Sequence, residues 1–382
     1  MLCYEFPPLG GGGGRVVHGL SRELARAGHE IDLVTMGFRG LPEYEEVDGV
    51  RIHRVPSLRR KMYYCTVGEA LSYVLGALPT LRRLVKENHY DLNHTHFIFP
   101  DGLLAWAIKR SMRLPYVITA HGSDVPGYNP HRLKFAHKLM SPLWGMVTRD
   151  AEQLICPSQS IRSLVEAQNE KLQVSVIPYG FDPRKFHPGR QKQNRIVVVT
   201  RMLERKGVQY FLKAIEGLSH DQEVHIVGDG PYLPTLKRMA QHVETPVRFW
   251  GWLDHRSPEF TDLFETSGIF VLPSESENFP VVLMEAMAAG MAIITTKGTG
   301  CEEVVGGVAL LVSPKNPTEI REALSRLICK PELREELGRN ARRRLENCFS
   351  WQAIGRQYAE LYENFARVGK ANDRERHLRE TR

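Results

Sequence analysis

Two carboxylates, Glu277 and Glu285, stand eight residues apart in the second half of the chain. The apolar run 269–272 precedes them in the sequence. Its length and composition predict a buried parallel strand. Asn278 suits a helix N-cap and Pro280 suits a first helical turn, so we expect a helix to begin there. The pattern predicts that Glu277 lies on a strand-to-helix loop and that Glu285 lies inside the helix.

Glu285 would then lie about 6 Å along the helix axis from Val281. The free N–H groups of the first turn, at the positive end of the helix dipole, favour a phosphate. One carboxylate on each side of an anion site suits a ligand with hydroxyls on both sides of a phosphate, as in a nucleotide-sugar. The alternative is a loop charge at Glu277 and a solvated helix residue at Glu285. That alternative fits Glu285 poorly, because its neighbours are apolar: Leu283, Met284, Ala286 and Met287.

Two cations, Arg201 and Lys206, follow another predicted strand at 195–200 and precede a predicted helix at 208–218. Ligands of α/β proteins bind at the carboxyl ends of strands, which is where these side chains are expected. Two fixed cations there can offset the negative charge that develops on a departing diphosphate, as a metal ion would. An ordinary basic loop is the alternative.

The first half of the chain offers glycines and histidines after its strands. Five consecutive glycines at 10–14 allow the backbone to approach a ligand closely, although a plain flexible loop would also use them. His121 lies just after the predicted strand 116–119, yet a single histidine is more often structural. His94 and His96 share one face of a strand, but no nearby carboxylate or cysteine completes a set of metal ligands.

Residues 276–290 resemble the E-x7-E signature of retaining glycosyltransferases of family 4, which have the GT-B fold. Pro280 is a departure, because the family commonly has glycine there, but proline still permits a helix start. The resemblance covers nearly the whole chain through three further motifs: Arg-x4-Lys-Gly at 201–207, His-Gly-Ser-Asp at 121–124 and Gly-x-Gly-Pro at 228–231.

The resemblance implies a role for each motif. Glu277 would hold hydroxyls of the donor sugar, Glu285 would hold the ribose, and His121 would contact the sugar from the opposite wall. Arg201 and Lys206 would hold the diphosphate. The resemblance therefore implies four catalytic residues: His121, Arg201, Lys206 and Glu277.

Other donor and acceptor contacts follow from the same motifs. In the family, a glycine pair in the first loop faces the donor diphosphate, and we choose Gly12 and Gly13 for this role. The donor-binding segment after Glu277 is expected to include Asn278, Phe279, Pro280 and Val281. On the acceptor side we expect His96 and Asp124, with capping of the next turn as an equal alternative for Asp124.

The expected reaction needs neither a metal nor another cofactor. No carboxylate is clearly placed as a covalent nucleophile, so the resemblance favours same-face attack, in which the leaving phosphate accepts the acceptor's proton. The chain has no Asp-x-Asp pair, which glycosyltransferases of the other main fold use to hold a divalent ion. Two rivals remain: a nucleotide-sugar epimerase of the same architecture, and a non-catalytic subunit that binds nucleotide-sugars. The intact motif residues argue against the second.

The 382 residues suffice for two domains, each with its own core. Strand and helix patterns alternate throughout, which predicts an α/β protein with parallel sheets covered by helices. We expect two Rossmann-like domains facing across a cleft: an acceptor domain at 1–177, a linker at 178–194 and a nucleotide-sugar domain at 195–350. A helix at 351–369 would return to the first domain, and a polar tail at 370–382 is expected to be disordered.

The expected strands are short and regularly spaced. The first, at residues 2–4, is shorter than is usual in the family, which leaves an upstream start open. The others lie at 31–35, 50–53, 92–94, 116–119, 153–156, 174–177, 195–200, 224–227, 247–249, 269–272, 292–295 and 309–312.

Composition excludes several classes of protein. Hydrophobic residues make up 42% of the chain and charged residues 25%, as in ordinary globular proteins. The six cysteines are scattered without a C-x-x-C pair, so neither a zinc site nor a disulfide framework is predicted. No stretch approaches the roughly 20 apolar residues of a membrane span, and the N-terminus does not resemble a signal sequence.

The net charge of +7 lies in the first half: residues 1–194 hold 25 Lys and Arg against 18 Asp and Glu, whereas residues 195–382 hold 26 of each. Mixed basic and apolar stretches at 58–64 and 131–140 would suit an anionic membrane surface. We therefore expect a cytoplasmic enzyme, peripheral on the membrane, with a sugar, glycolipid or lipid-linked acceptor. The alternative is a solvated basic face with a soluble or anionic sugar acceptor. No nucleic-acid partner is expected, and the donor base and the sugars stay open.

Overall fold

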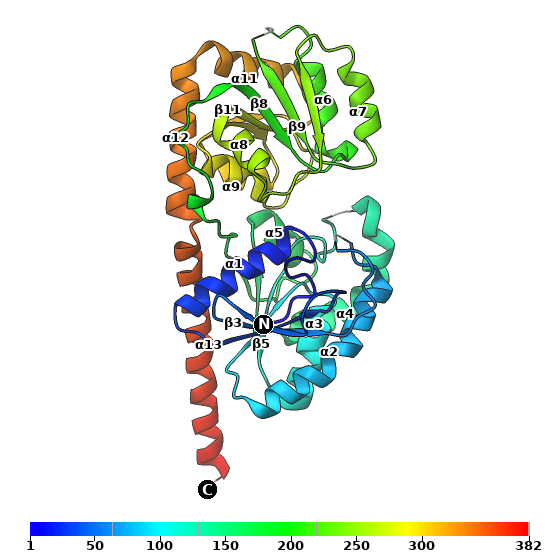
Figure 1. Cartoon of the computed structure of the whole chain (residues 1–382). Helices are drawn as coiled ribbons and strands as arrows, with labels where there is room; N and C mark the ends of the chain where they lie inside the picture. Colours follow the sequence, from blue (N-terminus) through cyan, green and yellow to red (C-terminus); the bar gives the residue numbers. More distant parts are fainter. Residues whose placement is uncertain (63, 129, 219–220, 381–382) are drawn as a thin grey trace. The chain divides into compact units, whose positions relative to one another are not determined.

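The computed structural model describes all residues except 63, 129, 219, 220, 381 and 382. At 130–139 and 366–380 it describes the backbone but not the side chains. The chain forms two compact units (Figure 1). The first unit comprises Met1–Gly180 and Trp351–Arg382, and the second comprises Phe181–Ser350. Most of the predicted linker, residues 178–194, therefore belongs to the second unit. Each unit is an α/β layer structure, which confirms the predicted pair of Rossmann-like domains.

The sheet of the first unit consists of two parts, with strand orders β2-β3-β1 and β4-β5-β6-β7. All its pairs are parallel except that between β2 and β3. Its strands are β1 (Ile31–Met36), β2 (Tyr44–Val47), β3 (Val50–Val55), β4 (Asn93–His96), β5 (Tyr116–Thr119), β6 (Gln153–Cys156) and β7 (Val174–Val176).

Leu2 joins the two parts of this sheet. It forms isolated parallel bridges to Val34 of β1 and Thr95 of β4, and its N–H donates to the carbonyl of His94 at 3.0 Å. The first strand predicted from the sequence, at residues 2–4, is therefore present only as these bridges. A parallel order of β3, β1, Leu2, β4 and β5 results.

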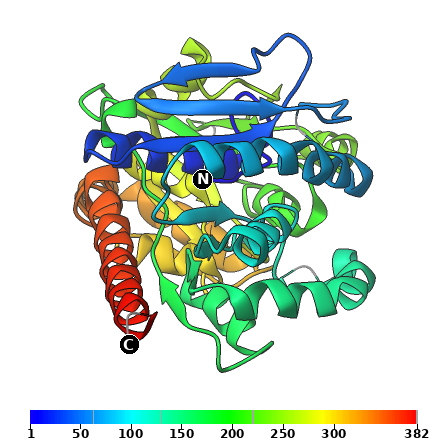
Figure 2. The same cartoon turned by 90° about the horizontal axis from the view of Figure 1, so that it is seen from below.

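Strand β2 was not predicted from the sequence. It pairs with β3 in an antiparallel hairpin at one edge of the three-stranded part (Figure 2). Asp48 and Gly49 make the turn with φ of 52° and 80°. An Asp-Gly pair with two positive φ angles is a common two-residue hairpin turn, so the sequence did contain a signal for this hairpin.

Helices cover both faces of the first sheet. Alternate strand residues point to opposite faces, so Leu33 packs with α1 and α13, whereas Val34 packs with α2 and α3. Helix α1 crosses α13 and contacts it, as both views show (Figures 1 and 2). The helices of this unit are α1 (Gly12–Arg26), α2 (Val67–Glu87), α3 (Asp101–Met112), α4 (Pro130–Asp150), α5 (Gln159–Glu166) and α13 (Trp351–Glu380).

The return of the C-terminal helix to the first unit is confirmed. The ring of Trp351 fills the space beside Gly19 and Gly180, where an added Cβ would lie within 2.2 Å of that ring. Ile354 and Tyr358 then enter the core. The helix extends to Glu380. The disorder expected for the polar tail at 370–382 stays a prediction.

The second unit is built on one six-stranded parallel sheet of order β10-β9-β8-β11-β12-β13. Helices α6, α7 and α11 pack on one face through a core that includes Phe211, Leu236 and Leu324. The strands are β8 (Gln193–Val199), β9 (Glu223–Val227), β10 (Val247–Gly251), β11 (Ser267–Leu272), β12 (Ala292–Thr296) and β13 (Leu310–Val312).

The other face of this sheet carries α9 and α12, which pack against β12, and α8, which packs against β8. The helices of the unit are α6 (Val208–Ala214), α7 (Leu233–Ala240), α8 (Pro258–Thr266), α9 (Val281–Ala288), α10 (Gly300–Val305), α11 (Pro317–Cys329) and α12 (Pro331–Cys348), with short 3-10 turns η1 (Pro183–Lys185) and η2 (Glu204–Lys206).

Candidate functional site

The predicted donor residues of the second unit gather at the carboxyl ends of two neighbouring strands. Arg201 follows β8, Lys206 ends η2, and Glu277 follows β11, which pairs with β8. Nζ of Lys206 lies 2.5 Å from Oε1 of Glu277. The side chains are only 8% and 11% exposed, so the two charges are largely removed from water.

Oε1 of Glu277 also accepts a hydrogen bond from Oγ of Ser274 at 2.9 Å. The hydroxyl of Thr296 in turn donates to the carbonyl of Ser274 at 2.7 Å. The Glu277 carboxylate is thus held by a cation and a fixed hydroxyl, and its loop is tied to β12. An oriented carboxylate of this kind can receive hydroxyl donors from a sugar without first being reorganised.

Two glycines bring the loops of this site together. Gly207 has φ of 72°, and an added Cβ would lie 2.0 Å from the carbonyl oxygen of Pro273. Gly300 would place a Cβ 1.4 Å from the carbonyl oxygen of Asn278, and its N–H donates to the carbonyl of Glu277 at 3.0 Å. Any side chain at either position would push these loops apart.

The segment after Glu277 enters α9 differently from the sequence prediction. The N-cap is Pro280, with no side-chain capping bond, and the helix begins at Val281. The prediction of Asn278 as N-cap is wrong, because the helix starts too late for its side chain to reach the first turn. Asn278 and Phe279 are each 6% exposed, and Phe279 packs edge-on against Phe349. The donor-binding role of residues 278–281 stays a prediction.

Glu285 is covered by two side chains that the sequence did not single out. Its Oε1 lies 2.6 Å from Nζ of Lys185 and 3.0 Å from Nδ1 of His255. Glu285 is 1% exposed, whereas Lys185 and His255 are 29% and 27% exposed. The ribose-binding role of Glu285 stays a prediction, and Lys185 and His255 form the accessible surface above it.

Lys185 is held in place by aromatic rings as well as by Glu285. Its Nζ lies 5.0 to 5.7 Å from the ring centroids of Phe181, Phe186 and Phe260. Lys185 stands 100 residues before Glu285 in the chain, in the segment predicted as a linker. The available sequence signal was a lysine between two phenylalanines. The sequence spacing could not show that its partner is Glu285.

Arg201 differs from Lys206 in its surroundings. It is exposed, and none of the acidic side chains that the structure describes pairs with it. A guanidinium that is accessible and uncompensated is ready to bind a phosphate. Arg205, by contrast, uses its carbonyl to accept from the N–H of Glu275, so it helps to fix the loop.

The predicted residues of the first unit gather around His121. Its Nε2 lies 3.2 Å from Nδ1 of His96, and its Nδ1 lies 2.8 Å from the hydroxyl of Tyr179. Burial lowers the pKa of His121 from 6.5 to about 3. The ring is therefore neutral at pH 7 and offers one donor nitrogen and one acceptor nitrogen.

His96 is completely buried behind His121. Burial lowers its pKa well below the usual range, with the nearby His94 and His121 acting in the same direction. The predicted contact of His96 with an acceptor stays a prediction, and its position also suits a role in orienting His121.

Asp124 connects two loops of the first unit. Its carboxylate accepts hydrogen bonds from the N–H of Ile98 at 2.9 Å and from the N–H of His121 at 3.0 Å. Burial raises the pKa of the Asp124 carboxyl, and these backbone hydrogen bonds oppose the shift. Both oxygens bind backbone of the loops after β4 and β5, and the two roles given for Asp124, acceptor contact and capping of the next turn, stay predictions.

Gly12 and Gly13 are the first two residues of α1, where backbone N–H groups lack partners within the helix. An added Cβ on Gly13 would lie 2.8 Å from the Phe97 ring and 3.7 Å from Nδ1 of His121. The first turn of α1 and His121 are therefore neighbours. Sequence reasoning missed Glu5, whose carboxylate accepts from the N–H of Gly11 at 3.3 Å and so fixes the glycine turn.

Outside the undescribed positions, no group of three or more His, Cys, Asp or Glu side chains could hold a metal ion. Within the same part of the chain, no helix has the length and apolar character needed to cross a membrane.

Comparison with known proteins places the chain among glycosyltransferases. A family model described as Glycosyltransferase Family 4 matches residues 10–185, and one described as Glycosyl transferases group 1 matches residues 181–344. An uncharacterized glycosyltransferase of Methanocaldococcus jannaschii is 26% identical over 95% of this chain and 97% of its own length. The N-acetyl-alpha-D-glucosaminyl L-malate synthase of Bacillus anthracis is 25% identical over 97% of each chain.

The structure of HepE from Anabaena, solved in complex with UDP and glucose, matches with a TM-score of 0.72 at 17% identity. The match covers 95% of this chain and 98% of that one. A likeness at this level of identity shows a shared fold.

Proposed function

Because the chain belongs to glycosyltransferase family 4, whose two models together match residues 10–344, we propose that it transfers a sugar from a nucleotide-sugar to an acceptor hydroxyl with retention of configuration. The observation that carries this proposal is the enclosed pair of Lys206 and Glu277 at 2.5 Å. The UDP and glucose in the Anabaena structure support a nucleotide-sugar as the donor.

Donor binding would exchange the partners of this pair. A diphosphate brings negative charge to Lys206 and to the uncompensated Arg201, and Lys206 can turn to it. Glu277 then has an oxygen free for the hydroxyls of the donor sugar, while Ser274 keeps the carboxylate in place. Since the cations are covalently part of the chain, they can stabilise the departing diphosphate without a divalent ion.

The proposed reaction proceeds on one face of the sugar. The bond from the sugar C1 to the phosphate oxygen breaks, the acceptor oxygen bonds to C1, and the acceptor's proton passes to the departing phosphate. His121 would present a neutral ring toward the sugar, held in place by His96 at Nε2 and by Tyr179 at Nδ1. Burial lowers the pKa of His121 to about 3, so the ring is neutral at pH 7.

A lipid or lipid-linked acceptor at an anionic membrane is the acceptor class that we propose. Two exposed basic residues, Arg60 and Lys61, lie in the same segment of the chain as several exposed apolar side chains. We call these side chains, on α2 and the loop before it, the apolar patch; they are Leu58, Met62, Tyr64, Val67, Leu71 and Leu75. Such a surface suits a membrane interface.

The structure modifies the membrane hypothesis in two places. Arg59 lies in the basic stretch 58–64, but it is 6% exposed and donates to the carbonyls of Lys61 and Met62, so it cannot face a lipid surface. The second stretch, 131–140, lies almost entirely outside the described side chains. The membrane proposal therefore depends on the apolar patch with Arg60 and Lys61.

A small anionic acceptor is the second candidate. The Bacillus anthracis relative is named for the transfer of a sugar to L-malate, a soluble dicarboxylate. A small soluble acceptor requires no membrane. Binding of the chain to lipid vesicles therefore distinguishes the lipid-linked acceptor from the soluble one.

The donor proposal is tested by a thermal-shift screen of UDP-, GDP- and ADP-sugars on the full chain. A ligand at 100 times its dissociation constant stabilises a protein by about 2.7 kcal/mol, so the correct donor should stand out. The best donor is then incubated with acceptor mixtures, and the products are analysed. Conversion of the donor to an epimer without an acceptor would favour the epimerase rival, and binding without turnover would favour the non-catalytic one.

The membrane proposal is tested by flotation with phosphatidylglycerol vesicles. The wild-type chain should float at low salt and should float less at high salt. The Leu71→Ser/Leu75→Ser variant should lose most binding, whereas Leu143→Ser, which removes a 39% exposed leucine elsewhere, should not. Failure of the wild type to bind at low salt would leave the soluble acceptor.

A further inference from the structure

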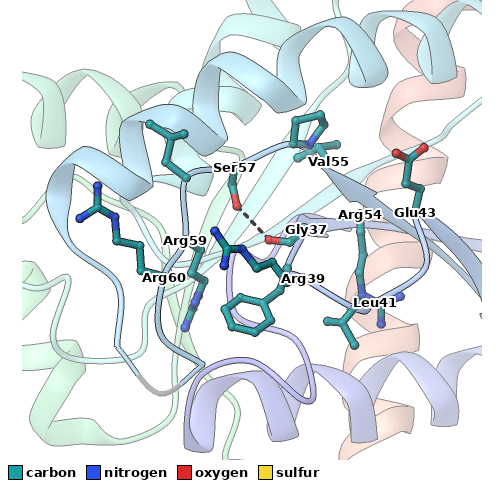
Figure 3. A pocket seen from close by; sticks show the side chains of 12 residues that line it. Gly37, Arg39, Leu41, Glu43, Arg54, Val55, Ser57, Arg59 and Arg60 are labelled. Carbon is teal, nitrogen blue, oxygen red and sulfur yellow. Dashed lines mark hydrogen bonds between the residues drawn. The ribbon is translucent and has the colours of Figure 1, made fainter.

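The first unit contains a cavity of 860 Å³ that the predicted site does not use. Two loops form its walls: Gly37–Leu41, which follows β1, and Pro56–Arg60, which follows β3 (Figure 3). Because β1 and β3 are parallel to β5, the cavity opens at the same carboxyl edge of the sheet that carries His121. This edge is where ligands of open α/β sheets bind.

The cavity has a net positive charge. Four arginines line it against one carboxylate, Glu43; the arginines are Arg39, Arg54, Arg59 and Arg60. Arg54 pairs with Glu45, and Arg59 has Glu5 at 4.0 Å.

Arg39 and Arg60 carry the uncompensated charge. Both are exposed, and no carboxylate in the described parts of the chain forms an ion pair with either side chain. Their side chains come from the two different loops (Figure 3). Two planar cations from two walls suit an anion with several oxygens.

The walls of the cavity are fixed before any ligand arrives. The hydroxyl of Ser57 donates to the carbonyl of Gly37 at 2.9 Å and ties the two loops together. The N–H of Leu58 donates to Ser72 and that of Arg60 to Glu69, both at the start of α2. Pre-formed walls reduce the entropy that binding would otherwise cost.

The buried Arg59 links the cavity to the glycine turn. Its guanidinium donates to the carbonyls of Tyr4, Lys61 and Met62, and Met62 also accepts from the N–H of Gly10 at 2.7 Å. Arg59 therefore acts as a scaffold that sets the position of Arg60 relative to the first turn of α1.

We propose that this cavity binds an anionic group of the acceptor, a phosphate or a carboxylate, away from the hydroxyl that receives the sugar. The proposal rests on the proposed transferase function and specifies the acceptor for it: an extended molecule with an anionic end. The positive cavity lies on the acceptor unit, and the diphosphate cations Arg201 and Lys206 belong to the other unit.

Sheet geometry gives the length of such an acceptor. Three strand spacings separate β5 from β1 through β4 and Leu2, and four separate β5 from β3. Neighbouring strands lie about 4.8 Å apart, so the anionic group would lie roughly 14–19 Å from the loop of His121. A single monosaccharide is too short to reach both places, and a longer glycan or a lipid-linked sugar can.

The anion can come from a lipid or from a soluble molecule. Leu58 lines the cavity, is 72% exposed and belongs to the apolar patch. A phosphate that carries an acyl chain could therefore place the phosphate in the cavity and the chain against the patch. A soluble sugar phosphate would use the arginines alone.

The test is isothermal titration of the full chain with two probes, inorganic phosphate and dihexanoyl phosphatidic acid. Both probes should bind the Arg201→Ala/Lys206→Ala variant, in which the diphosphate site is disabled. Adding Arg39→Gln/Arg60→Gln to that variant should weaken both at least ten-fold. The matched control is Arg82→Gln/Arg83→Gln, which removes two exposed arginines of α2 outside this cavity and should leave both affinities unchanged.

The relative affinity of the probes identifies the source of the anion. Tighter binding of phosphatidic acid than of phosphate supports a lipid phosphate, and equal binding supports a soluble acceptor. Wild-type affinity for both probes in the Arg39→Gln/Arg60→Gln background would overturn the proposal, as would an equal loss in the control. Neither result would contradict the donor proposal. That proposal is tested separately, by the thermal shift that nucleotide-sugars cause in the Arg39→Gln/Arg60→Gln protein.

Discussion

The surroundings of His121 in the first unit and of Glu277 and Glu285 in the second differ in their electrostatics. In the second unit, carboxylates face cations in two pairs, the enclosed Lys206 with Glu277 and the partly exposed Lys185 with Glu285. In the first unit, His121 and His96 are neutral because burial lowers their pKa values. Paired charges must exchange partners when a charged ligand arrives, whereas neutral rings can keep one geometry. The difference suits a diphosphate-bearing donor on one unit and an uncharged sugar contact on the other.

The largest expected effect comes from breaking the Lys206–Glu277 pair. Glu277→Gln should lower the transfer rate about a hundred-fold, equivalent to about 3 kcal/mol, because the charged acceptor for sugar hydroxyls is lost. Nucleotide binding should largely survive, since Lys206 and Arg201 remain. Turnover with the best donor and its dissociation constant are measured together; a wild-type rate would remove Glu277 from the mechanism.

The second pair should matter more for stability. Glu285→Gln leaves Lys185 among three aromatic rings without its carboxylate and should cost about 1–3 kcal/mol, less than a fully buried pair because Lys185 is 29% exposed. Lys185→Met should restore part of this loss in the double variant. The denaturant midpoints of the wild type, Glu285→Gln, Lys185→Met and the double variant give the coupling free energy between the two side chains. Strictly additive losses of stability would show that the pair is not coupled.

Acid should weaken the first unit through its buried histidines. The pKa of His121 is about 3 in the folded chain and 6.5 when unfolded, so the unfolded state binds an extra proton between these values. Stability is therefore fully present above pH 6.5 and falls as the pH drops towards 3, by about 1–2 kcal/mol between pH 6.5 and 5 from this group.

The check compares urea unfolding at pH 7.5 and pH 5 for the wild type and His121→Asn. The variant should lose less stability on acidification than the wild type. Some loss should remain, because burial also lowers the pKa values of His94 and His96. Identical slopes in the two proteins would mean that His121 is accessible to protons in the folded state.

The smallest expected effect concerns the hydroxyl of Tyr179. Tyr179→Phe removes one hydrogen bond to Nδ1 of His121, worth about 1 kcal/mol, and keeps the ring that stacks on it. We expect a several-fold lower turnover with unchanged nucleotide binding. An unchanged rate would show that His96 alone orients the imidazole.

Much of the candidate site could be predicted from local sequence. Glu277, Arg201 and Lys206 each follow an apolar strand, and parallel strands bring their carboxyl ends together, so spacing alone indicates a shared site. The sequence could not show that Lys206 and Glu277 pair directly, because that contact depends on Gly207 and its approach to Pro273. It also could not show that Arg59 is buried while Arg60 is exposed.

The errors have local causes. The helix after Glu277 starts at Val281, so an Asn that suits a cap by type is too early to act as one. The β2–β3 hairpin was missed although Asp48 and Gly49 signal its turn, because β2 is exposed and lacks an apolar pattern. The partners of Glu285 come from distant loops, and no spacing rule connects them.

In the mechanism that we propose, the chain's own cations replace a metal in a retaining transfer. Its direct test is a transfer reaction in EDTA with the donor that stabilises the chain most, followed by proton NMR of the first product formed. We expect full activity in EDTA and a product with the anomeric configuration of the donor, with both rate and donor affinity reduced in Lys206→Ala. Activity lost in EDTA and restored by Mg²⁺ or Mn²⁺, or a product of inverted configuration, would contradict it.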